Sequence, residues 1–337
     1  MPAIVCNCSS IGQNGRLLIE TTGTGPRTFT GTSTRVEFLY ETLGTKRNLQ
    51  HTDSITGTTS RLITGVRPKS YLTQGVIALQ ASPSNLHLML PFILGGTAGA
   101  VGSGLGIDVD ADGNDRNYPL ESILPTFDAM VYRESGIFQY TDLQVAQAIL
   151  RGKTANGGEA NDFMELLLVV IGQQEIITRF GDPSPWPAVE PALPITVDYL
   201  PYAFWESDFY LNNVKMPFEE FKLTVDNMLS IKFYDELFPT CIRSTGRKIS
   251  MEGDLPFTCA ALEETLDLYN AQGTAEFRMA TPPTTPTFHS SFRLPFARAE
   301  WQTPTIRNKA DLPFKVMVEG YASAGLDEMV TTNDNVI

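Results

Sequence analysis

The chain has few of the residues that build metal centres, disulfide frameworks and catalytic bases. Its 337 residues include three histidines, and none has a His or Cys partner at the spacing of a metal site. The four cysteines, Cys6, Cys8, Cys241 and Cys259, are too few and too scattered for a disulfide framework, which predicts reduced thiols and synthesis in a cytosol. The sequence contains no local signature of a catalytic nucleophile with its base. We therefore predict that the protein is not an enzyme and binds no cofactor.

Long apolar runs and an excess of positive charge are also missing. No run approaches 18 apolar residues, and the chain does not begin with a basic segment followed by an apolar one, so we expect neither a membrane-spanning helix nor a secretory signal. The net charge of -13 argues against a surface that binds nucleic-acid phosphates or anionic lipid. The length is sufficient for two domains of ordinary size.

A cluster of prolines divides the sequence. Five prolines fall within twelve residues, at Pro183, Pro185, Pro187, Pro191 and Pro194, and this density predicts an extended, semi-rigid connector. The predicted organisation is an N-terminal arm at 1–33, a first domain at 34–180 with an inserted loop at 95–126, a Pro-rich linker at 181–195, a second domain at 196–322 and a C-terminal tail at 323–337.

The two halves share an order of elements. In each half a pair of glycines 20 residues apart brackets a short apolar stretch and then a helix with apolar residues at +4 and +7 spacing. The glycines are Gly75 and Gly95, then Gly253 and Gly273; the helical triplets are Leu86, Leu90 and Ile93, then Leu262, Leu266 and Tyr269. Each half closes with a strand that ends in glycine, at 163–172 and 314–320. The repetition predicts assembly geometry rather than catalysis.

The local patterns predict a mainly antiparallel β structure with one helix in each half, arranged as a β-sandwich or a partly closed barrel. Alternation of Val36, Phe38 and Tyr40 predicts a half-buried strand, and segments 52–62 and 71–79 predict a hairpin that turns at 65–68. Further strands are expected over 128–132, 143–150, 163–171, 221–226 and 314–318.

Capping residues mark the first helix. Ser82 is suited to the N-cap and Pro83 to the first helical position, while Gly95 is suited to the C-cap. Pro91 should kink this helix or end it near Leu90. Segments 1–33 and 95–126 have too few apolar residues to offset the entropy of ordering, so we expect them to become ordered only in contact with a partner.

One acidic motif is a metal candidate. Asp108, Asp110 and Asp112 match the first half of a calcium loop, but its twelfth position, which requires a bidentate carboxylate, is Pro119. We therefore interpret the segment as a solvated acidic loop, with a divalent-ion site as the alternative. Cys6 with Cys8 would need two more ligands from distant positions.

A tight aromatic cluster supports a rival function. Tyr202, Phe204, Trp205, Phe209 and Tyr210 would serve a β-sandwich module for host recognition or carbohydrate binding if they were exposed. Since large apolar residues are usually buried, we expect this cluster to form the start of the second core instead.

The arrangement resembles the major tail tube proteins of siphophages, which are long-tailed bacteriophages. The resemblance is carried by the run from Gly75 through Ser82-Pro83 to Gly95, and by 221–227 followed by Arg243 and Gly246-Arg247. It covers residues 34 to 322 and consists of patterns, not of an invariant motif.

The resemblance implies two packed antiparallel sheets, a flanking helix and a loop that reaches a neighbouring ring. Most relatives have one such domain in a subunit and six subunits in a ring. Two tandem tube domains would favour a trimer with pseudo-sixfold symmetry, with a hexamer as the alternative. The function implied is a virion tail subunit that stacks with other tail proteins into the channel for DNA ejection. DNA would pass the acidic lumen without specific binding.

Overall fold

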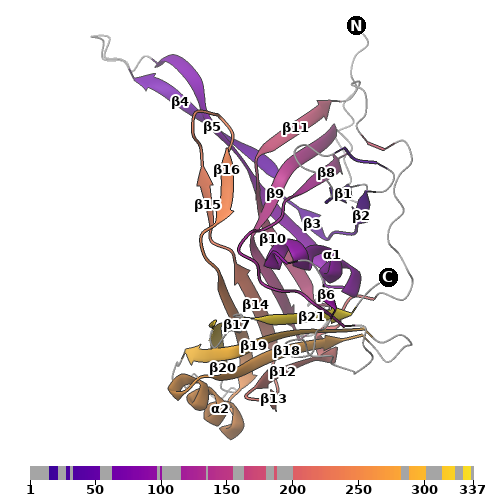
Figure 1. Ribbon diagram of the computed structural model, residues 1–337, viewed down its shortest axis with the longest axis vertical. Helices are drawn as coiled ribbons and strands as arrows, with labels where there is room; N and C mark the ends of the chain where they lie inside the picture. The colour runs from indigo at the N-terminus through magenta and orange to yellow at the C-terminus, as the bar shows by residue number, and fades with distance from the viewer. Residues whose placement is uncertain are drawn as a thin grey trace.

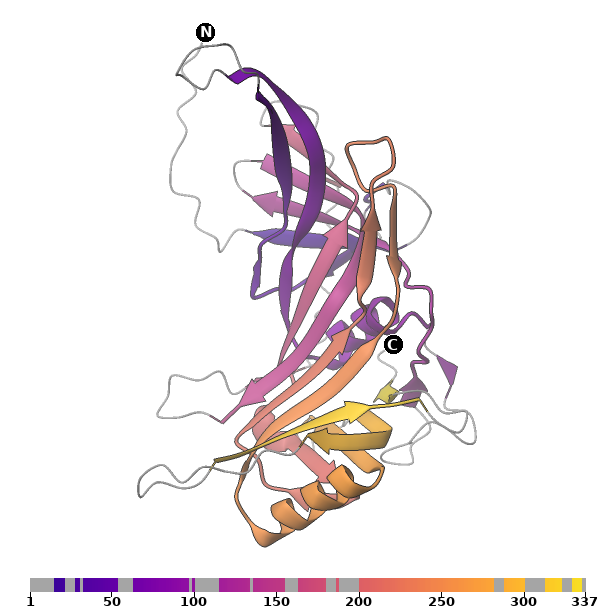
Figure 2. The same ribbon diagram turned by 90° about the vertical axis from the view of Figure 1, so that its left-hand side faces the viewer.

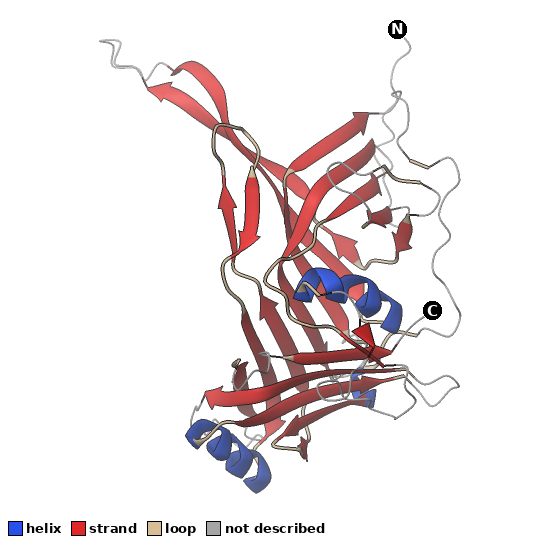
Figure 3. Cartoon of the chain, viewed as in Figure 1, coloured by secondary structure: helices blue, strands red, loops and turns tan. Residues whose placement is uncertain are grey.

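The structure is a computed structural model, and it describes residues 15–21, 28–30, 33–53, 63–96, 99–100, 115–133, 136–154, 163–179, 186–187, 200–281, 288–300, 313–322 and 329–334. Strands dominate these residues and two α-helices accompany them (Figure 3). The predicted fold class, mainly β with a minor helical part, is therefore confirmed. Nineteen strands join one antiparallel sheet system that does not close into a barrel within the described residues.

The first half of the chain contains the following elements: β1 (Arg16–Glu20), β2 (Thr34–Val36), β3 (Tyr40–Glu41), β4 (Gly44–Asp53), β5 (Ile63–Gln80), α1 (Pro83–Leu94), β6 (Gly99–Ala100), β7 (Asp115–Asn117), β8 (Phe127–Arg133), β9 (Gly136–Lys153), β10 (Glu165–Gly172) and β11 (Gln174–Arg179).

The second half begins with a short 3-10 helix at Phe204–Glu206 and continues with these elements: β12 (Ser207–Leu211), β13 (Val214–Met216), β14 (Glu220–Asp226), β15 (Leu229–Lys232), β16 (Cys241–Ser244), β17 (Lys248–Pro256), α2 (Cys259–Asn270), β18 (Gly273–Ala280), β19 (His289–Glu300), β20 (Pro313–Gly320) and β21 (Val330–Asp334).

The same order of paired strands occurs in both halves. The first half runs β2-β1-β8-β9-β10-β5 and then β3 and β4. The second runs β13-β12-β18-β19-β20-β17-β14. In each half a further strand, β11 or β21, pairs with the first part of the long strand β9 or β19. The halves are joined end to end, with α1 between them and α2 at the lower end of the molecule (Figure 1).

The first helix begins and ends at the capping residues that the sequence predicts, and the second begins at a cap that was not predicted. Ser82 caps α1 by accepting a hydrogen bond from the Asn85 N–H, Pro83 occupies the first turn, and Gly95 ends the helix in the left-handed region at φ 95°. Thr258 caps α2 in the same way, by accepting from the Ala261 N–H. The two helices are each 12 residues long.

Pro91 does not end α1 near Leu90, so that alternative of the prediction was wrong. The helix continues through it to Leu94, and the Gly95 N–H donates to the Pro91 carbonyl at 2.8 Å. Phe92, Ile93 and Leu94 are buried beyond the proline. Their packing supports a last turn that local propensity alone would not, because tertiary contacts provide most helical stability in proteins.

The predicted core face of α2 was wrong by one residue. Ala261, Thr265 and Leu268 face the core, whereas Leu262 and Leu266 are half-buried and Tyr269 is 54% exposed. Two stripes one residue apart both have +4 and +7 spacing, so the period alone did not identify the side that packs against β19.

The strand predictions were confirmed over 128–132, 143–150, 221–226 and 314–318, and over 165–171 of the predicted 163–171. Two were wrong in detail. Val36 and Tyr40 belong to separate strands, β2 and β3. The strand β5 pairs with β4, which contains only the first two residues of the predicted 52–62; residues 54–62 lie outside the described residues. Residues 65–68 lie inside β5 instead of at a turn. Figure 2 shows this long β4–β5 hairpin rising above the rest of the first half.

Parts of the segments assigned to an arm, a loop and a tail belong to the fold. Leu17, Leu18 and Ile19 of β1 are fully buried between β2 and β8, so the expectation of a partner-ordered arm was wrong for 16–20. Tyr118 in the inserted loop is also fully buried, and β21 in the tail pairs with β19 and β7. The strand β1 was not predicted because its three consecutive apolar residues show no alternation with polar ones. Most of the linker at 181–195 lies outside the described residues.

Candidate assembly interface

Strand pairing joins the two halves. The second part of β9 pairs with β10 of its own half on one edge and with β14 on the other. The β9–β14 register runs over seven pairs, from Lys153 opposite Glu220 to Gln147 opposite Asp226. The second half therefore extends the sheet of the first by adding a strand to its edge, which is a general way for β proteins to associate.

Helix α1 covers this junction from one face. Leu86, Leu90 and Ile93 are at most 3% exposed. Leu223 of β14 and Phe292 of β19 line the same small apolar cavity as these three residues, so the second half contributes to their burial. Full burial of a large aliphatic side chain stabilises a fold by about 1.5–3 kcal/mol, and part of this gain at α1 holds the halves together.

Two polar side chains of the second half hold the C-terminal end of α1. The Asn227 amide donates to the carbonyls of Ile93 and Val145, both at 3.0 Å. Arg247 donates through Nε to the Asn227 side-chain oxygen at 2.8 Å and through Nη2 to the Leu94 carbonyl at 3.1 Å. The last carbonyls of a helix have no partner inside it, and cationic groups are favourable at that end. Asn227 and Arg247 therefore provide the missing hydrogen-bond donors, and Arg247 also places a positive charge at this helix end; both residues belong to the second half.

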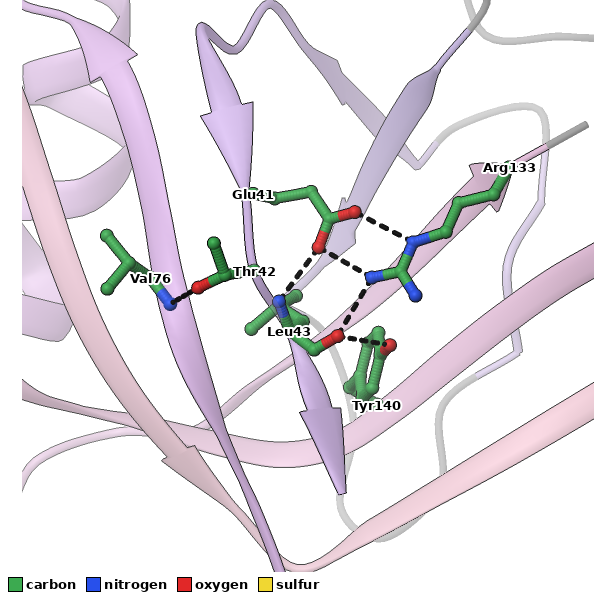
Figure 4. Close-up of polar contacts among 6 residues, drawn as sticks. All are labelled: Glu41, Thr42, Leu43, Val76, Arg133 and Tyr140. Carbon is green, nitrogen blue, oxygen red and sulfur yellow. Dashed lines mark hydrogen bonds and ion pairs between the residues drawn. The ribbon is translucent and has the colours of Figure 1, made fainter. Parts of the chain in front are cut away.

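The opposite edge of the first half is capped by side chains (Figure 4). Between β3 and β4, the Leu43 N–H donates to the Glu41 carboxylate at 2.8 Å. The Leu43 carbonyl accepts from Arg133 Nη2 at 2.8 Å and from the Tyr140 hydroxyl at 2.9 Å. Arg133 also grips Glu41 with two hydrogen bonds, at 2.8 and 2.7 Å. Both main-chain groups of Leu43 are thus satisfied without a neighbouring strand.

A close approach between the strands produces this break. Thr42 and Val76 make a mixed pair, in which the Thr42 N–H donates to the Val76 carbonyl and the Thr42 hydroxyl replaces the backbone as acceptor for the Val76 N–H at 3.0 Å. Leu43 then lies directly over Gly75, where an added Cβ would be 2.7 Å from the Leu43 Cα. Only glycine permits this approach without movement of the backbone.

The Tyr140 hydroxyl must keep its proton to donate a hydrogen bond to the Leu43 carbonyl. Burial raises the pKa of the Tyr140 phenol well above its ordinary value, while the neighbouring Arg133 charge acts in the opposite direction. The hydroxyl consequently stays a hydrogen-bond donor to Leu43 through the physiological pH range.

The sheet carries a charged face opposite its core. In β14 the buried residues Phe221, Leu223 and Val225 alternate with polar ones. Cross-strand ion pairs link the polar residues of neighbouring strands: Arg151 with Glu165, Lys153 with Glu220, Lys222 and Lys315 with Glu252, and Lys248 with Glu319.

Glu252 has two cationic partners on this face. Partial burial acts to raise the pKa of its carboxyl, but hydrogen bonds from Lys315 and Lys222, each at 3.1 Å, outweigh it and lower that pKa. The resulting surface is polar and largely charge-compensated rather than basic.

The predicted metal candidates are not brought into any described site. Asp108, Asp110, Asp112, Cys6 and Cys8 all lie outside the described residues. Within the described ranges, no three His, Cys, Asp or Glu side chains gather as metal ligands would. Neither helix of these ranges is both long and apolar enough to cross a membrane.

The aromatic cluster lies mainly in the core, as predicted. Tyr202 and Phe209 are fully buried and Phe204 is 5% exposed, whereas Trp205 is 65% exposed. Phe209 contacts Phe218 and Phe221, and Phe221 stacks on Phe277 at 3.6 Å between ring centroids. The cluster therefore stabilises the start of the second half and does not form a broad aromatic surface.

No protein-family model and no curated protein sequence matches the chain.

The sequence did not assign roles to the residues of the junction. Asn227 and Arg247 contributed to the family resemblance, but nothing local indicates that they hold a helix more than a hundred residues away. Glu41 and Arg133 are 92 residues apart, and no periodic pattern links them. A polar residue directly after an alternating strand, as Asn227 is after β14, was the only signal present.

Proposed function

We propose that the chain is a structural virion protein that assembles as stacked rings into the tail tube of a long-tailed phage, the channel for DNA ejection into the host. The observation that carries the proposal is the repeated strand order, joined edge to edge by β9 and β14. A unit that binds its own repeat through a sheet edge has the geometry for continued assembly. The sequence resemblance to siphophage tail tube proteins gives that assembly its identity.

Each half would act as one tube domain. The contact between them is head-to-tail, since β14 at one edge of the second domain meets β9 of the first. Head-to-tail contacts generate closed rings when the rotation closes and open filaments when it does not. Three chains would supply six domains and a pseudo-sixfold ring, which we favour; a hexamer of chains is the alternative.

Closure would place one face of the continued sheet toward the channel. The face with the cross-strand ion pairs is suited to this role because its charges are mostly compensated, and the chain as a whole is acidic at -13. DNA phosphates would find few free cations there, so the genome would slide past without specific binding. Other tail proteins would contact the ends of the tube.

The rival function, a host-recognition or carbohydrate-binding module, would require an exposed aromatic surface. Burial of Tyr202, Phe204 and Phe209 removes most of the cluster that supported it. In our proposal the protein has no catalytic role and no cofactor, is made in the host cytoplasm, and resides in the virion tail.

Negative-stain electron microscopy of the purified full chain, together with native mass spectrometry, tests the proposal. We expect hollow rings or tubes with six-lobed end views and three chains in each ring. Six chains in each ring would select the hexamer. A protein that stays monomeric at all accessible concentrations and salt conditions would contradict the tail tube function.

A further inference from the structure

The two helices occupy equivalent places in their halves but differ in how they are covered. Each begins directly after its N-cap, Ser82 or Thr258, and each cap accepts from the N–H three residues later. Aligned on these caps, the predicted triplets coincide: Leu86, Leu90 and Ile93 of α1 correspond to Leu262, Leu266 and Tyr269 of α2.

Two further buried positions of the helices also coincide. Met89 and Phe92 of α1 are buried, and so are their counterparts Thr265 and Leu268 in α2. Each helix therefore packs one stripe on its own half. The second stripe differs, because it is buried in α1 and partly exposed in α2, where Tyr269 is 54% exposed.

The cover over the second stripe of α1 comes partly from the following repeat. Leu223 and Phe292 of the second half line the cavity at Leu86, Leu90 and Ile93. Among the described residues no further half packs on α2, which lies at the lower end of the molecule (Figure 1). Its apolar stripe is thus the surface that a further repeat would cover.

We infer that the α2 stripe, defined as Leu262, Leu266 and Tyr269, binds the first half of a second copy of this chain, in the way that the second half covers α1. This inference rests on the proposed self-assembly and names the contact through which it proceeds.

The register identifies the partner's residues. Tyr40 pairs with Ala78 as Glu220 pairs with Asp254, and Ala78 and Asp254 each lie four residues before a helix N-cap. Asn227, which holds the end of α1, lies seven residues after Glu220. The equivalent position, seven residues after Tyr40, is Arg47 in β4.

Arg47 is suited to the same task in a neighbouring copy. It is exposed on the β4–β5 hairpin, and a guanidinium is favourable beside the carbonyl groups at a helix C-terminus. No described side chain donates a hydrogen bond to the last carbonyls of α2, in contrast to those of α1.

Charge complements the fit. The hairpin exposes Lys46, Arg47, Arg67 and Lys69. The α2 helix carries Glu263, Glu264 and Asp267 and has no basic residue. Opposite charges at the rim of an apolar contact favour the correct partner and orientation.

The first test compares the same substitution at equivalent positions. Leu266→Asp should leave the melting temperature of the monomer within about 2 °C of wild type, because a half-exposed site tolerates charge, and should abolish rings and tubes in electron micrographs and in light scattering. Leu90→Asp places the charge in the covered stripe of α1 and should lower the melting temperature strongly.

The second test is a cross-link that requires two copies. In a chain whose four native cysteines are replaced by serine, Arg47→Cys with Tyr269→Cys should give, on mild oxidation, a ladder of disulfide-linked chains that ends at the ring size. Each single-cysteine variant should give no ladder. Assembly of Leu266→Asp like wild type, or absence of the ladder while wild type forms rings, overturns this contact alone. Wild-type protein that never associates overturns both the contact and the tail tube proposal.

Discussion

Removal of the Asn227 side chain should loosen the junction between the halves more than any other single deletion of a polar group there. Asn227 is fully buried, and its amide makes three hydrogen bonds, to the Ile93 carbonyl, the Val145 carbonyl and Arg247. In Asn227→Ala, both carbonyls lose a donor in a space closed to water. Each buried group left without a partner costs about 1–3 kcal/mol, while Arg247 is accessible enough to be hydrated. We expect a loss of about 3 kcal/mol in the free energy of unfolding.

Urea unfolding of monomeric protein, followed by far-ultraviolet circular dichroism, measures this loss as a lower midpoint at unchanged slope. The matched control is Asn48→Ala. Asn48 donates to the Ser70 hydroxyl at 3.0 Å on the exposed β4–β5 hairpin, where water replaces the lost bond, so its cost should be about 0.5 kcal/mol or less. Equal losses for the two variants, or a loss below about 1 kcal/mol for Asn227→Ala, would refute the view that this side chain holds the halves together.

Two further predictions concern the first-half edge and the charged face. Gly75→Ala should lower the free energy of unfolding by about 1–3 kcal/mol, because its Cβ would lie 2.7 Å from backbone atoms of Thr42 and Leu43. The control Gly44→Ala, where nothing lies within 4 Å of the added Cβ, should be neutral in the same urea titration. Equal effects of the two substitutions would contradict the close approach at Gly75. Because the pKa of Glu252 is lowered in the fold, its ion pairs stabilise the protein above the unfolded pKa of 4.5 and lose this effect as pH falls through the folded value. The stability difference between wild type and Glu252→Gln should therefore be largest near neutral pH and shrink below about pH 4.5, and a difference that stays constant across this range would show that the charge contributes nothing.

The sequence predicted those elements whose signals are local. Ser82 with Pro83 and Gly95 determine the ends of α1 through their own backbone geometry, and alternation in 221–226 follows directly from one buried face. The side on which α2 packs could not be obtained in this way. Stripes at 261/265/268 and 262/266/269 are both compatible with one amphipathic helix, and the choice depends on β19, which is distant in the chain.

The candidate interface depends even more on long-range contacts. Glu41, Leu43 and Arg133 come together only because β3, β4 and β8 meet at one edge. The turn of the first hairpin was misplaced for a related reason, since Gly65 and Pro68 are ordinary turn residues that lie within β5. Pro68 lies in the part of β5 that pairs with β4 but not with β10, and such an edge tolerates a proline where a strand paired on both sides would not. This pairing could not be predicted from the local sequence.

The strand β14 and its counterpart in the first half, β3 with β4, show how one position in a repeat has opposite requirements. The strand β14 is continuous over seven residues and pairs with β17 on one side and β9 on the other. Neither of its edges is therefore open to a strand of another molecule. Its counterpart in the first half is interrupted at Thr42 and Leu43, and the backbone there is capped by Glu41, Arg133 and Tyr140. Exposed, unbroken edges pair indiscriminately with other strands, and bulges or charges at an edge suppress this. If the first half is to meet a second copy only in the register that α2 and the basic hairpin select, its edge must be unattractive to every other strand. The break at Leu43 would then prevent unspecific strand pairing, while the exposed apolar stripe on α2 would provide the specific contact. Together they would let the chain stay soluble alone and associate in a single geometry.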